Sequence, residues 1–460
     1  MAQDRKDLIV LGGGAAGVAA SVRARQLGAS VALVEKEHLG GVCMNKGCIP
    51  TKCLMEVARL YHFLRKQTPA GVRIGQVELD WDEIMSRKQD LVGYLRMGTE
   101  GVLKSNGVEI LRGEARFHDS KAIEVEGRLL EAQGFVVATG SRWKPPAVEG
   151  METEGVITTD ELLELKAVPD SAVVLGSGPV ELEAAQYLLF LGCRVTLIEA
   201  QGRLLPQEDR EMVRRLASAL REQGMTILTG AKLLRVERGE GALSCLLETK
   251  EGQRRIQASL LLHANRVPRL EGLNLDRAGI HASNGILDVD RHLRTSQGNI
   301  LGAGDVTGSP FYSHRASAMG IKAAENALGQ NAAWDPASVP RALFTYPQMA
   351  AVGLTESQAK ETGREVRCAT IPYSVNAKAI IDLETEGAVK IVSEARYGEI
   401  LGVHIVGPQA TELISEGALA MELEATVEDL ASAIRLHPSL SESQVEAARE
   451  CLGRGIYLLR

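Results

Sequence analysis

Aromatic residues are scarce in this sequence, making up 4% of its 460 residues, whereas glycine occurs 47 times. This balance disfavours a β-sandwich and favours α/β sheets with glycine-rich turns. The net charge is −7, which argues against the basic footprint typical of nucleic-acid binding. No apolar run is long enough to cross a membrane. The length corresponds to about three domains.

Cysteine is also infrequent. The 7 cysteines are an odd number scattered along the chain, which excludes the disulfide framework of a small secreted protein. The chain enters the apolar segment 8–11 almost at once, without the features of a signal peptide or an organellar presequence. We therefore expect a cytoplasmic protein, in which a disulfide is more often catalytic than structural.

Residues 7–35 have the pattern of strand, glycine turn, helix and strand that binds dinucleotides. Gly12 makes the turn, Gly14 lets a pyrophosphate approach the backbone, and Gly17 lets the helix pack closely on the strand. The helix N-terminus receives the pyrophosphate. Glu35, at the end of the second strand, can accept hydrogen bonds from ribose hydroxyls, and this acid distinguishes the segment from an ordinary glycine turn.

Residues 171–199 repeat this pattern with Gly176, Gly178 and a terminal Glu199, which predicts a second dinucleotide site. Glu181 stands where the third glycine would be. A side chain there has little room. We expect it either to point to solvent toward a basic partner, with the helix shifted slightly, or to crowd the pyrophosphate and weaken binding.

Two cysteines, Cys43 and Cys48, lie five positions apart in a stretch that contains glycines 40, 41 and 47. Residues five apart on a regular helix point in different directions, so a bridge between them requires an irregular helix entry. Pro50 fits the first turn of the following helix, where its missing N–H costs nothing. A thiolate at a helix N-terminus is stabilised by the helix dipole, so the stretch predicts a redox pair.

This stretch resembles the redox-active disulfide of the pyridine nucleotide–disulfide oxidoreductases. The family pattern is Gly-Gly-Thr-Cys, four residues and Cys, and here Val42 replaces the threonine. Residues 300–306 resemble the family's second FAD motif. The segment from His437 to Glu442, which reads His-Pro-Ser-Leu-Ser-Glu, resembles its catalytic acid/base motif. The resemblance covers essentially the whole chain.

The resemblance implies that the first dinucleotide is FAD and the second a nicotinamide nucleotide. A carboxylate at Glu199 repels a 2′-phosphate, so we expect NAD(H) rather than NADP(H). The residues implied for FAD are Gly12, Gly14, Gly17, Glu35, Lys52, Ala115, Thr139, Gly140, Ser141 and Asp305. Those implied for NAD(H) are Gly176, Gly178, Glu183, Glu199 and Asn265. Asn265 replaces the usual glycine, Glu183 is expected to pair with Lys52 beside the flavin, and no metal site is expected.

The fold implied is α/β, with two Rossmann-like dinucleotide-binding domains and a C-terminal α+β interface domain. The FAD domain is expected at residues 1–142 and 266–335, the NAD domain at 143–265 and the interface domain at 336–460. A homodimer is implied because the family counterpart of His437, which Glu442 orients, reaches the redox cysteines of the other subunit. No nucleic-acid or membrane partner is expected.

The implied reaction is the oxidation of dihydrolipoyl groups, free or on a lipoyl-bearing protein, because the His-Pro segment is nearest to that of members with this activity. His437 would take the thiol proton, Cys43 would exchange sulfur with the substrate, and Cys48 would lie against the flavin, with NAD⁺ as acceptor. A mercury-reducing member would carry a C-terminal cysteine pair, and here only Cys451 lies near the end. Two alternatives stay open: an NADH-dependent reductase of another low-molecular-weight disulfide, and a non-catalytic subunit of a lipoyl-bearing complex.

Overall fold

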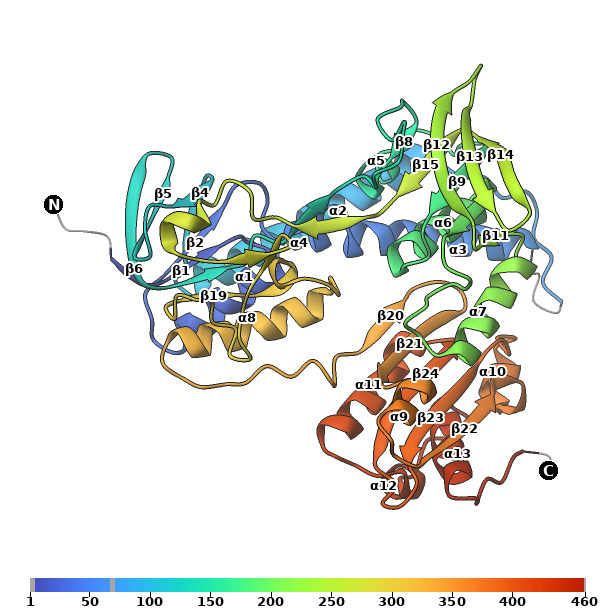
Figure 1. Cartoon of the computed structure of the whole chain (residues 1–460). Helices are drawn as coiled ribbons and strands as arrows, with labels where there is room; N and C mark the ends of the chain where they lie inside the picture. Colours follow the sequence, from blue (N-terminus) through green and yellow to red (C-terminus); the bar gives the residue numbers. More distant parts are fainter. Residues whose placement is uncertain (1–4, 67–70, 459–460) are drawn as a thin grey trace.

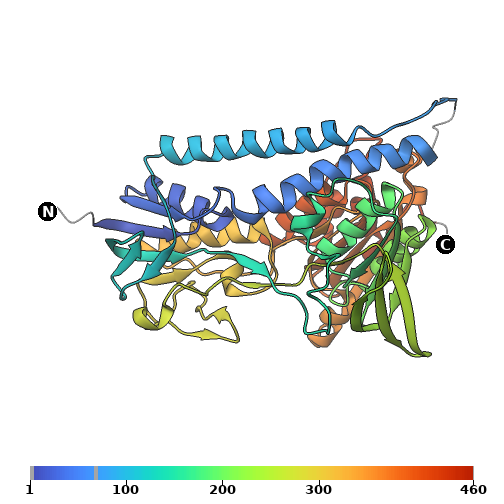
Figure 2. The ribbon, with the colours of Figure 1, turned by 90° about the horizontal axis from the view of Figure 1, so that it is seen from above.

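The three largest sheets divide the chain into three units, which two long helices join (Figure 1). The computed structural model describes residues 5–66 and 71–458. Helix α3 (Cys48–Lys66) and helix α4 (Trp81–Ser105) lie side by side along one face of the molecule, as Figure 2 shows. Helix α2 (Gly41–Lys46) directly precedes α3.

The first unit is built on a seven-stranded sheet. Its order is β3 (Glu109–Arg112), β2 (Val31–Glu35), β1 (Lys6–Leu11), β6 (Arg128–Val137), β5 (Ala122–Val125) and β4 (Ala115–Phe117), and β19 (Ile300–Gly302) also pairs with β6. Leu8 and Val10 pack under helices α1 (Ala15–Gln26) and α8 (Ser313–Ala327), whereas Ile9 and Leu11 face the hairpin β4–β5. Strand β1 is a continuous apolar run because both of its faces are covered.

The second unit has a five-stranded parallel sheet. Its order is β11 (Thr226–Thr229), β10 (Arg194–Glu199), β9 (Ser171–Leu175), β15 (Leu260–His263) and β8 (Val156–Ile157). Helices α6 (Pro179–Phe190) and α7 (Arg210–Glu222) cover one face. The antiparallel strands β12 (Lys232–Arg238), β13 (Leu243–Thr249) and β14 (Gly252–Ala258) cover the other.

The third unit is an antiparallel sheet with helices. The strand order is β20 (Arg341–Leu343), β21 (Gln348–Gly353), β24 (Ile400–Gly407), β23 (Ala388–Glu394) and β22 (Val366–Pro372). Its helices are α9 (Glu356–Glu361), α10 (Ala377–Ile381), α11 (Ala410–Glu422), α12 (Val427–Ser432) and α13 (Glu442–Cys451).

Short elements connect these units. The antiparallel pair β7 (Ser141–Trp143) and β16 (Arg266–Pro268) links the first unit to the second. Helix α5 (Thr159–Leu162), the hairpin β17 (Ala282–Ser283) and β18 (Ile286–Leu287), and the 3₁₀ turns Leu275–Ala278, Gly304–Thr307 and Tyr373–Val375 complete the described structure.

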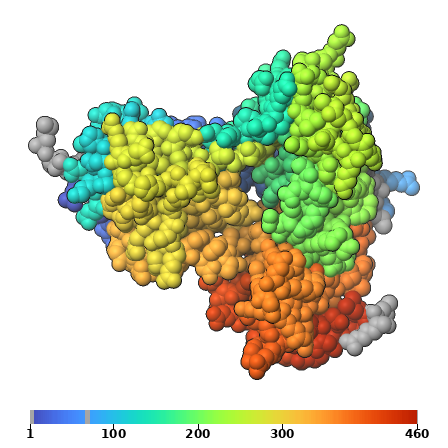
Figure 3. Space-filling model, in the orientation of Figure 1, coloured from blue at the N-terminus to red at the C-terminus, as the bar shows by residue number. Residues whose placement is uncertain are grey.

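Helix α3 is fixed by a core that it shares with the other units. Leu54 and Met55 of α3 belong to the same buried cluster as Leu182 of α6 and Met349 of β21. The helix that carries the redox cysteine is therefore packed against both the second and the third unit. Figure 3 shows the hollow where the first unit faces the other two.

The α/β class expected from the sequence is confirmed, with a C-terminal unit of antiparallel sheet and helices. None of the helices among residues 5–66 and 71–458 has the length and apolar character needed to span a membrane.

Candidate active site

The two predicted redox cysteines lie on either side of a helix break. Cys43 is in α2, and Cys48 is the first residue of α3. Gly47 allows this break, since a Cβ there would come within 3.3 Å of the Cα of Cys43. Pro50 falls in the first turn of α3, where no intrahelical N–H bond is lost. Both side chains are partly buried, and both are free thiols in this structure.

The surroundings make the two thiols unequal. The hydrogen bond from Cys43 lowers the pKa of Cys48, and the charge of Lys52 and the hydroxyl of Ser313 lower it further, against burial and the charge of Glu183. The pKa of Cys43 is raised by the same hydrogen bond and by burial. Cys48 is thus the thiol that ionises first, and its position at the N-terminus of α3 adds to this.

Lys52 is held one turn after Cys48 by an ion pair. Its Nζ lies 2.5 Å from Oε2 of Glu183, whose side chain is only 5% exposed. The other oxygen of Glu183 accepts a 2.9 Å hydrogen bond from the backbone N–H of Phe344, and Lys52 lies over the Phe344 ring at 4.6 Å. Glu183 therefore ties α3 and α6 to the third unit, and it keeps a positive charge beside the cysteines.

The first glycine fingerprint forms a cradle at the end of β1. A Cβ on Gly17 would lie 1.8 Å from the carbonyl oxygen of Gly12, so only glycine allows this approach of helix and turn. Glu35 accepts hydrogen bonds from the backbone N–H of Gly13 at 2.6 Å and of Glu37 at 2.7 Å. This fixes the carboxylate at the strand end, where a ribose is expected.

A cavity runs from this cradle to the redox cysteines. The residues that line it include Gly12, Gly14, Glu35, Ala115, Thr139, Gly140, Ser141 and Asp305, with Cys43, Cys48 and Lys52 at its far end. Gly17 is not among the residues that line this cavity, and it packs against Gly12 instead. A glycine cradle, an acid at the strand end and a continuous channel to the thiols fit FAD.

Asp305 is held in place by two neighbours. It accepts hydrogen bonds from Oγ of Ser141 at 2.5 Å and from a guanidinium nitrogen of Arg266 at 3.2 Å. The guanidinium group of Arg266 lies over the rings of Trp143 and Phe311. The strands that connect the first and second units therefore help to position a residue that was assigned to FAD.

The second fingerprint repeats the geometry of the first around its acid. Glu199 is buried, and it accepts hydrogen bonds from Oγ of Ser177 at 2.5 Å and from the backbone N–H of Gln201 at 2.7 Å. Glu35 likewise accepts a hydrogen bond from the backbone N–H of the residue two positions later, Glu37. The side-chain hydroxyl of Ser177 takes the part that the backbone of Gly13 plays in the first fingerprint.

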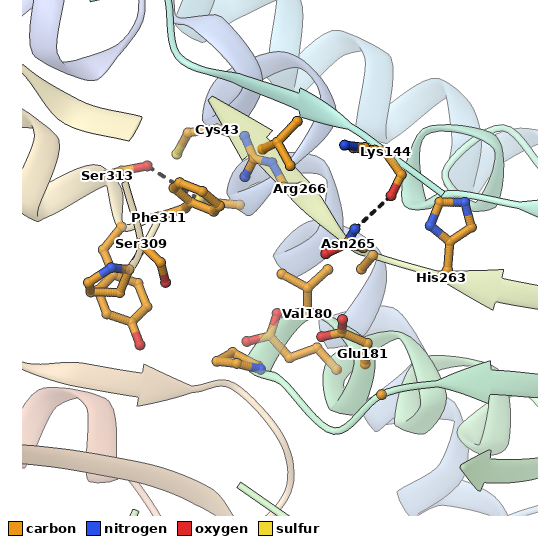
Figure 4. A pocket seen from close by; sticks show the side chains of 18 of the residues that line it. Cys43, Lys144, Val180, Glu181, His263, Asn265, Arg266, Ser309, Phe311 and Ser313 are labelled. Atoms are coloured by element: carbon orange, nitrogen blue, oxygen red, sulfur yellow. Dashed lines mark hydrogen bonds between the residues drawn. The ribbon is translucent and has the colours of Figure 1, made fainter. Parts of the chain in front are cut away.

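Glu181 does not point to a basic partner in solvent. Its Oε2 lies 2.6 Å from where a Cβ of Gly178 would be, and its Oε1 lies 3.3 Å from the same position on Gly176. The carboxylate is therefore folded over the glycine turn (Figure 4). The side chain is only partly buried at the cavity wall, but the loss of hydration in this crowded turn raises its pKa to about 7, and the charges of Glu199 and Glu183 contribute in the same direction.

Asn265 lies on the segment that leads from the second unit to β16. Its side-chain amide donates a 2.8 Å hydrogen bond to the backbone carbonyl of Lys144 (Figure 4). The backbone carbonyl of Asn265 accepts a hydrogen bond from the backbone N–H of Lys144. The asparagine thus fastens two connecting segments together. It lines a second, larger cavity of about 1830 Å³ that also contains Cys43, Cys48, Lys52, Gly176, Glu181, Glu183 and Glu199. Gly178 lies beneath Glu181 and does not line it.

His437 and Glu442 lie in the third unit. Nδ1 of His437 is 3.0 Å from Oε1 of Glu442, whose other oxygen accepts from the backbone N–H of Ser439 at 2.8 Å. The side chain of His437 is 74% exposed and lines neither of the two cavities described above. One chain therefore brings together the cysteines, Lys52 and Glu183, but not His437.

Ser313 is a site residue that the sequence did not single out. Its Oγ lies 3.6 Å from Sγ of Cys48, and it is the first residue of α8. The two residues are 265 positions apart, and no local pattern connects them. Only the packing of α8 toward the start of α3 reveals the contact.

Two dinucleotide-binding cavities that meet at a cysteine pair define a thiol–disulfide oxidoreductase that uses FAD and NAD(H). The family model described as pyridine nucleotide-disulphide oxidoreductase matches residues 6–330, and the model of its dimerisation domain matches residues 339–448. The chain belongs to this family.

Known proteins resemble the chain over nearly its full length. It is 39% identical over 459 residues to a dihydrolipoyl dehydrogenase of Thermus scotoductus, covering 98% of this chain and 99% of the relative. The solved structure of LpdA from Mycobacterium tuberculosis matches with a TM-score of 0.89 and 29% identity, covering 97% of this chain and 99% of that one. A Cu(II) complex of the HOCl-induced flavoprotein disulfide reductase RclA from Escherichia coli matches with a TM-score of 0.87 and 27% identity, covering 97% of this chain and 100% of that one.

Proposed function

We propose that this protein oxidises dihydrolipoyl groups, free or on a lipoyl-bearing protein, with NAD⁺ as electron acceptor. The observation that carries the proposal is that Cys43 and Cys48 line both cavities, so one thiol pair borders both dinucleotide sites. The name of the Thermus relative supports the choice of substrate.

The chemistry begins with the oxidised pair. His437 of a second copy of the chain takes a proton from one substrate thiol, and the resulting thiolate attacks Sγ of Cys43. The Cys43–Cys48 bond breaks and Cys48 leaves as a thiolate, which suits the thiol with the lowered pKa. The second substrate thiol then loses its proton to solvent, and the resulting thiolate attacks the substrate sulfur of the mixed disulfide. The lipoyl disulfide forms, and Cys43 leaves with the proton held by His437.

The balance of this half-reaction is one substrate dithiol converted to a disulfide, one protein disulfide reduced and one proton released. FAD, when bound, supplies the carrier that passes the electron pair on to NAD⁺. Lys52 stabilises the Cys48 thiolate, because its charge lowers the pKa of that thiol. Glu183 keeps Lys52 in place through their ion pair.

We assign residues 1–142 and 266–335 to an FAD domain, residues 143–265 to an NAD domain and residues 336–460 to an interface domain. The pairing of β19 with β6 supports the split first domain, since it returns residues 300–302 to the first sheet. We also propose that the residues expected from the sequence to bind FAD, to bind NAD(H) and to act in catalysis have these roles. A homodimer is supported by the match to the dimerisation domain and by the solvent exposure of His437.

We place the protein in the cytoplasm. The 7 cysteines are scattered along the chain and do not form the disulfide framework of a small secreted protein.

A second candidate is an NADH-dependent reductase of another low-molecular-weight disulfide. It is favoured by the carboxylate of Glu181 in the second fingerprint and by the likeness to RclA, which is described as a disulfide reductase. Steady-state turnover separates the two candidates. We expect fast reduction of NAD⁺ by dihydrolipoamide, lost in both Cys43→Ser and Cys48→Ser. Faster oxidation of NADH by cystine or glutathione disulfide than by lipoamide would favour the second candidate.

A further inference from the structure

The second dinucleotide site carries an anion of its own. In such a fingerprint, the glycine turn and the helix N-terminus receive the pyrophosphate. The carboxylate of Glu181 lies over this turn, with Oε2 2.6 Å from the Cβ position of Gly178. In the first fingerprint the same place is held by Gly17, which has no side chain.

The start of α6 also offers fewer donors than the start of α1. Pro179 is the first residue of α6 and has no backbone N–H, whereas Ala15 begins α1. The free N–H groups that would meet a phosphate are therefore reduced in number. The carboxylate of Glu181 lies at this positive end of the helix, and its own backbone N–H stabilises the ionised form.

The charges around Glu181 do not neutralise it. The titratable side chains of the second unit that line the same cavity are Lys144, Glu183, Glu199, Lys232 and His263. The cations Lys52, Arg142 and Arg266 approach from neighbouring segments, and Arg142 is paired with Glu271. Lys52 is paired with Glu183, and Arg266 with Asp305. Burial lowers the pKa of His263, which disfavours its charged form. Among residues 5–66 and 71–458, no cation forms an ion pair with Glu181.

We propose that Glu181 is an internal competitor for the pyrophosphate of NAD(H), so that nucleotide binding at this site is coupled to the uptake of one proton. The ionised carboxylate and the diphosphate cannot share the turn without repulsion. Binding therefore proceeds with protonation of Glu181. The protein with an ionised Glu181 carboxylate takes up one nucleotide and one proton, and in the resulting complex this carboxyl group is neutral. Glu181 thereby determines the nucleotide affinity of the site and its dependence on pH. The loss of hydration in the crowded turn raises the pKa of Glu181 to about 7, which brings this linkage into the physiological range.

The test is calorimetric titration of the FAD-loaded protein with NAD⁺ from pH 5.5 to 8.5, in two buffers of different ionisation enthalpy. We expect nearly one proton taken up per NAD⁺ at pH 8 and almost none at pH 5.5. The Kd should rise by about tenfold per pH unit above the pKa of Glu181, as linkage requires. Glu181→Gln and Glu181→Gly should bind without proton uptake and with a Kd that does not change with pH. Glu181→Gly should also bind more tightly at pH 8.

Glu222→Gln, an exposed change at the end of α7 in the same unit, is the matched control and should keep the proton uptake of the parent protein. The FAD spectrum and the melting temperature of each variant show whether it is folded. Two independent substitutions keep the test decisive should one of them fail to fold. Proton uptake that persists in either variant would overturn the proposal, as would a parent Kd that is independent of pH. Failure of all these proteins to bind NAD⁺ would overturn it as well. Turnover with dihydrolipoamide does not enter this measurement. A failure of the Glu181 proposal can therefore be distinguished from a failure of the proposed dihydrolipoyl substrate.

Discussion

The imidazole of His437 is hydrogen bonded to the carboxylate of Glu442, with 3.0 Å between Nδ1 and Oε1, yet it faces solvent and lines neither cavity that contains Cys43. The carboxylate leaves Nε2 free to accept a proton. In the function proposed above, the pair is an oriented base that acts on substrate at the cysteines of another chain. This is the arrangement expected of an active site shared across a dimer.

Replacing this base should slow the dithiol half-reaction without disturbing the fold. We expect His437→Ala to lower kcat with dihydrolipoamide by about 10²–10⁴-fold, the usual contribution of a well-placed general base. Because His437 is exposed, FAD content and dimer mass should stay unchanged, as checked by absorbance and light scattering. A loss of less than a few-fold would show that His437 is not the base.

The contact between Ser313 and Cys48 should be visible in the spectrum of the reduced protein. A Cys48 thiolate beside the flavin should give a long-wavelength absorbance band, and Cys48→Ser should abolish it.

The hydroxyl of Ser313 lowers the pKa of Cys48. Ser313→Ala should therefore move the pH midpoint of the band upward, and Ser313→Thr should restore it. An unchanged midpoint in Ser313→Ala would remove Ser313 from the site.

Glu199 should make NAD⁺ the preferred acceptor. Its carboxylate is fixed by Ser177 and Gln201 at the strand end, where a 2′-phosphate would meet a negative charge. We expect kcat/KM to be higher with NAD⁺ than with NADP⁺, and the gap to narrow in Glu199→Gln. Equal efficiencies in the parent protein would contradict this and point to a compensating cation.

Lys390 should be important for the docking of the second unit on the third. Its Nζ is buried and lies 3.1 Å from Asp209 and 2.7 Å from Glu356. Lys390→Met would leave these carboxylates close together, and removal of one partner from a buried ion pair typically costs about 3–5 kcal/mol. We expect a clearly lower melting temperature at pH 7. Lys378→Met, which breaks the exposed pair with Asp382, should change it little.

The effect of Lys390→Met should depend on pH. Lys360 and Lys390 lower the pKa of Glu356 to about 2. A lowered pKa contributes stability above the unfolded-state value, and this stability is lost as the pH falls toward 2. The difference in melting temperature between the parent and Lys390→Met should therefore stay nearly constant from pH 7 to about pH 5 and shrink from about pH 5 to about pH 3, as scanning fluorimetry would measure. A difference that grows on acidification would contradict this account of the network.

The parts of the fold that local sequence determines could be predicted. Gly17 and Glu35 belong to one short segment whose spacing is dictated by a single turn and helix, and Cys43 and Cys48 are likewise neighbours in the chain. For residues this close in the chain, the spacing in the sequence determines their relative positions. Their surroundings could be inferred only through resemblance to a family.

The remainder depends on contacts between distant segments. Glu183 meets Lys52 across 131 positions and the backbone of Phe344 across 161. The contact of Ser313 with Cys48 has no local signal. For Glu181, the sequence showed that a side chain occupies a crowded place, but only the structure shows that its carboxylate folds over the turn.

In the proposed function, Cys43 and Cys48 accept electrons directly from a dihydrolipoyl dithiol. Anaerobic stopped-flow mixing of the FAD-loaded protein with dihydrolipoamide, without nucleotide, tests it directly. We expect uptake of two electrons per chain and growth of the long-wavelength band at a rate no slower than kcat. Cys48→Ser should show neither. A parent protein that stays oxidised under these conditions, or is reduced only much more slowly than it turns over, would contradict the account.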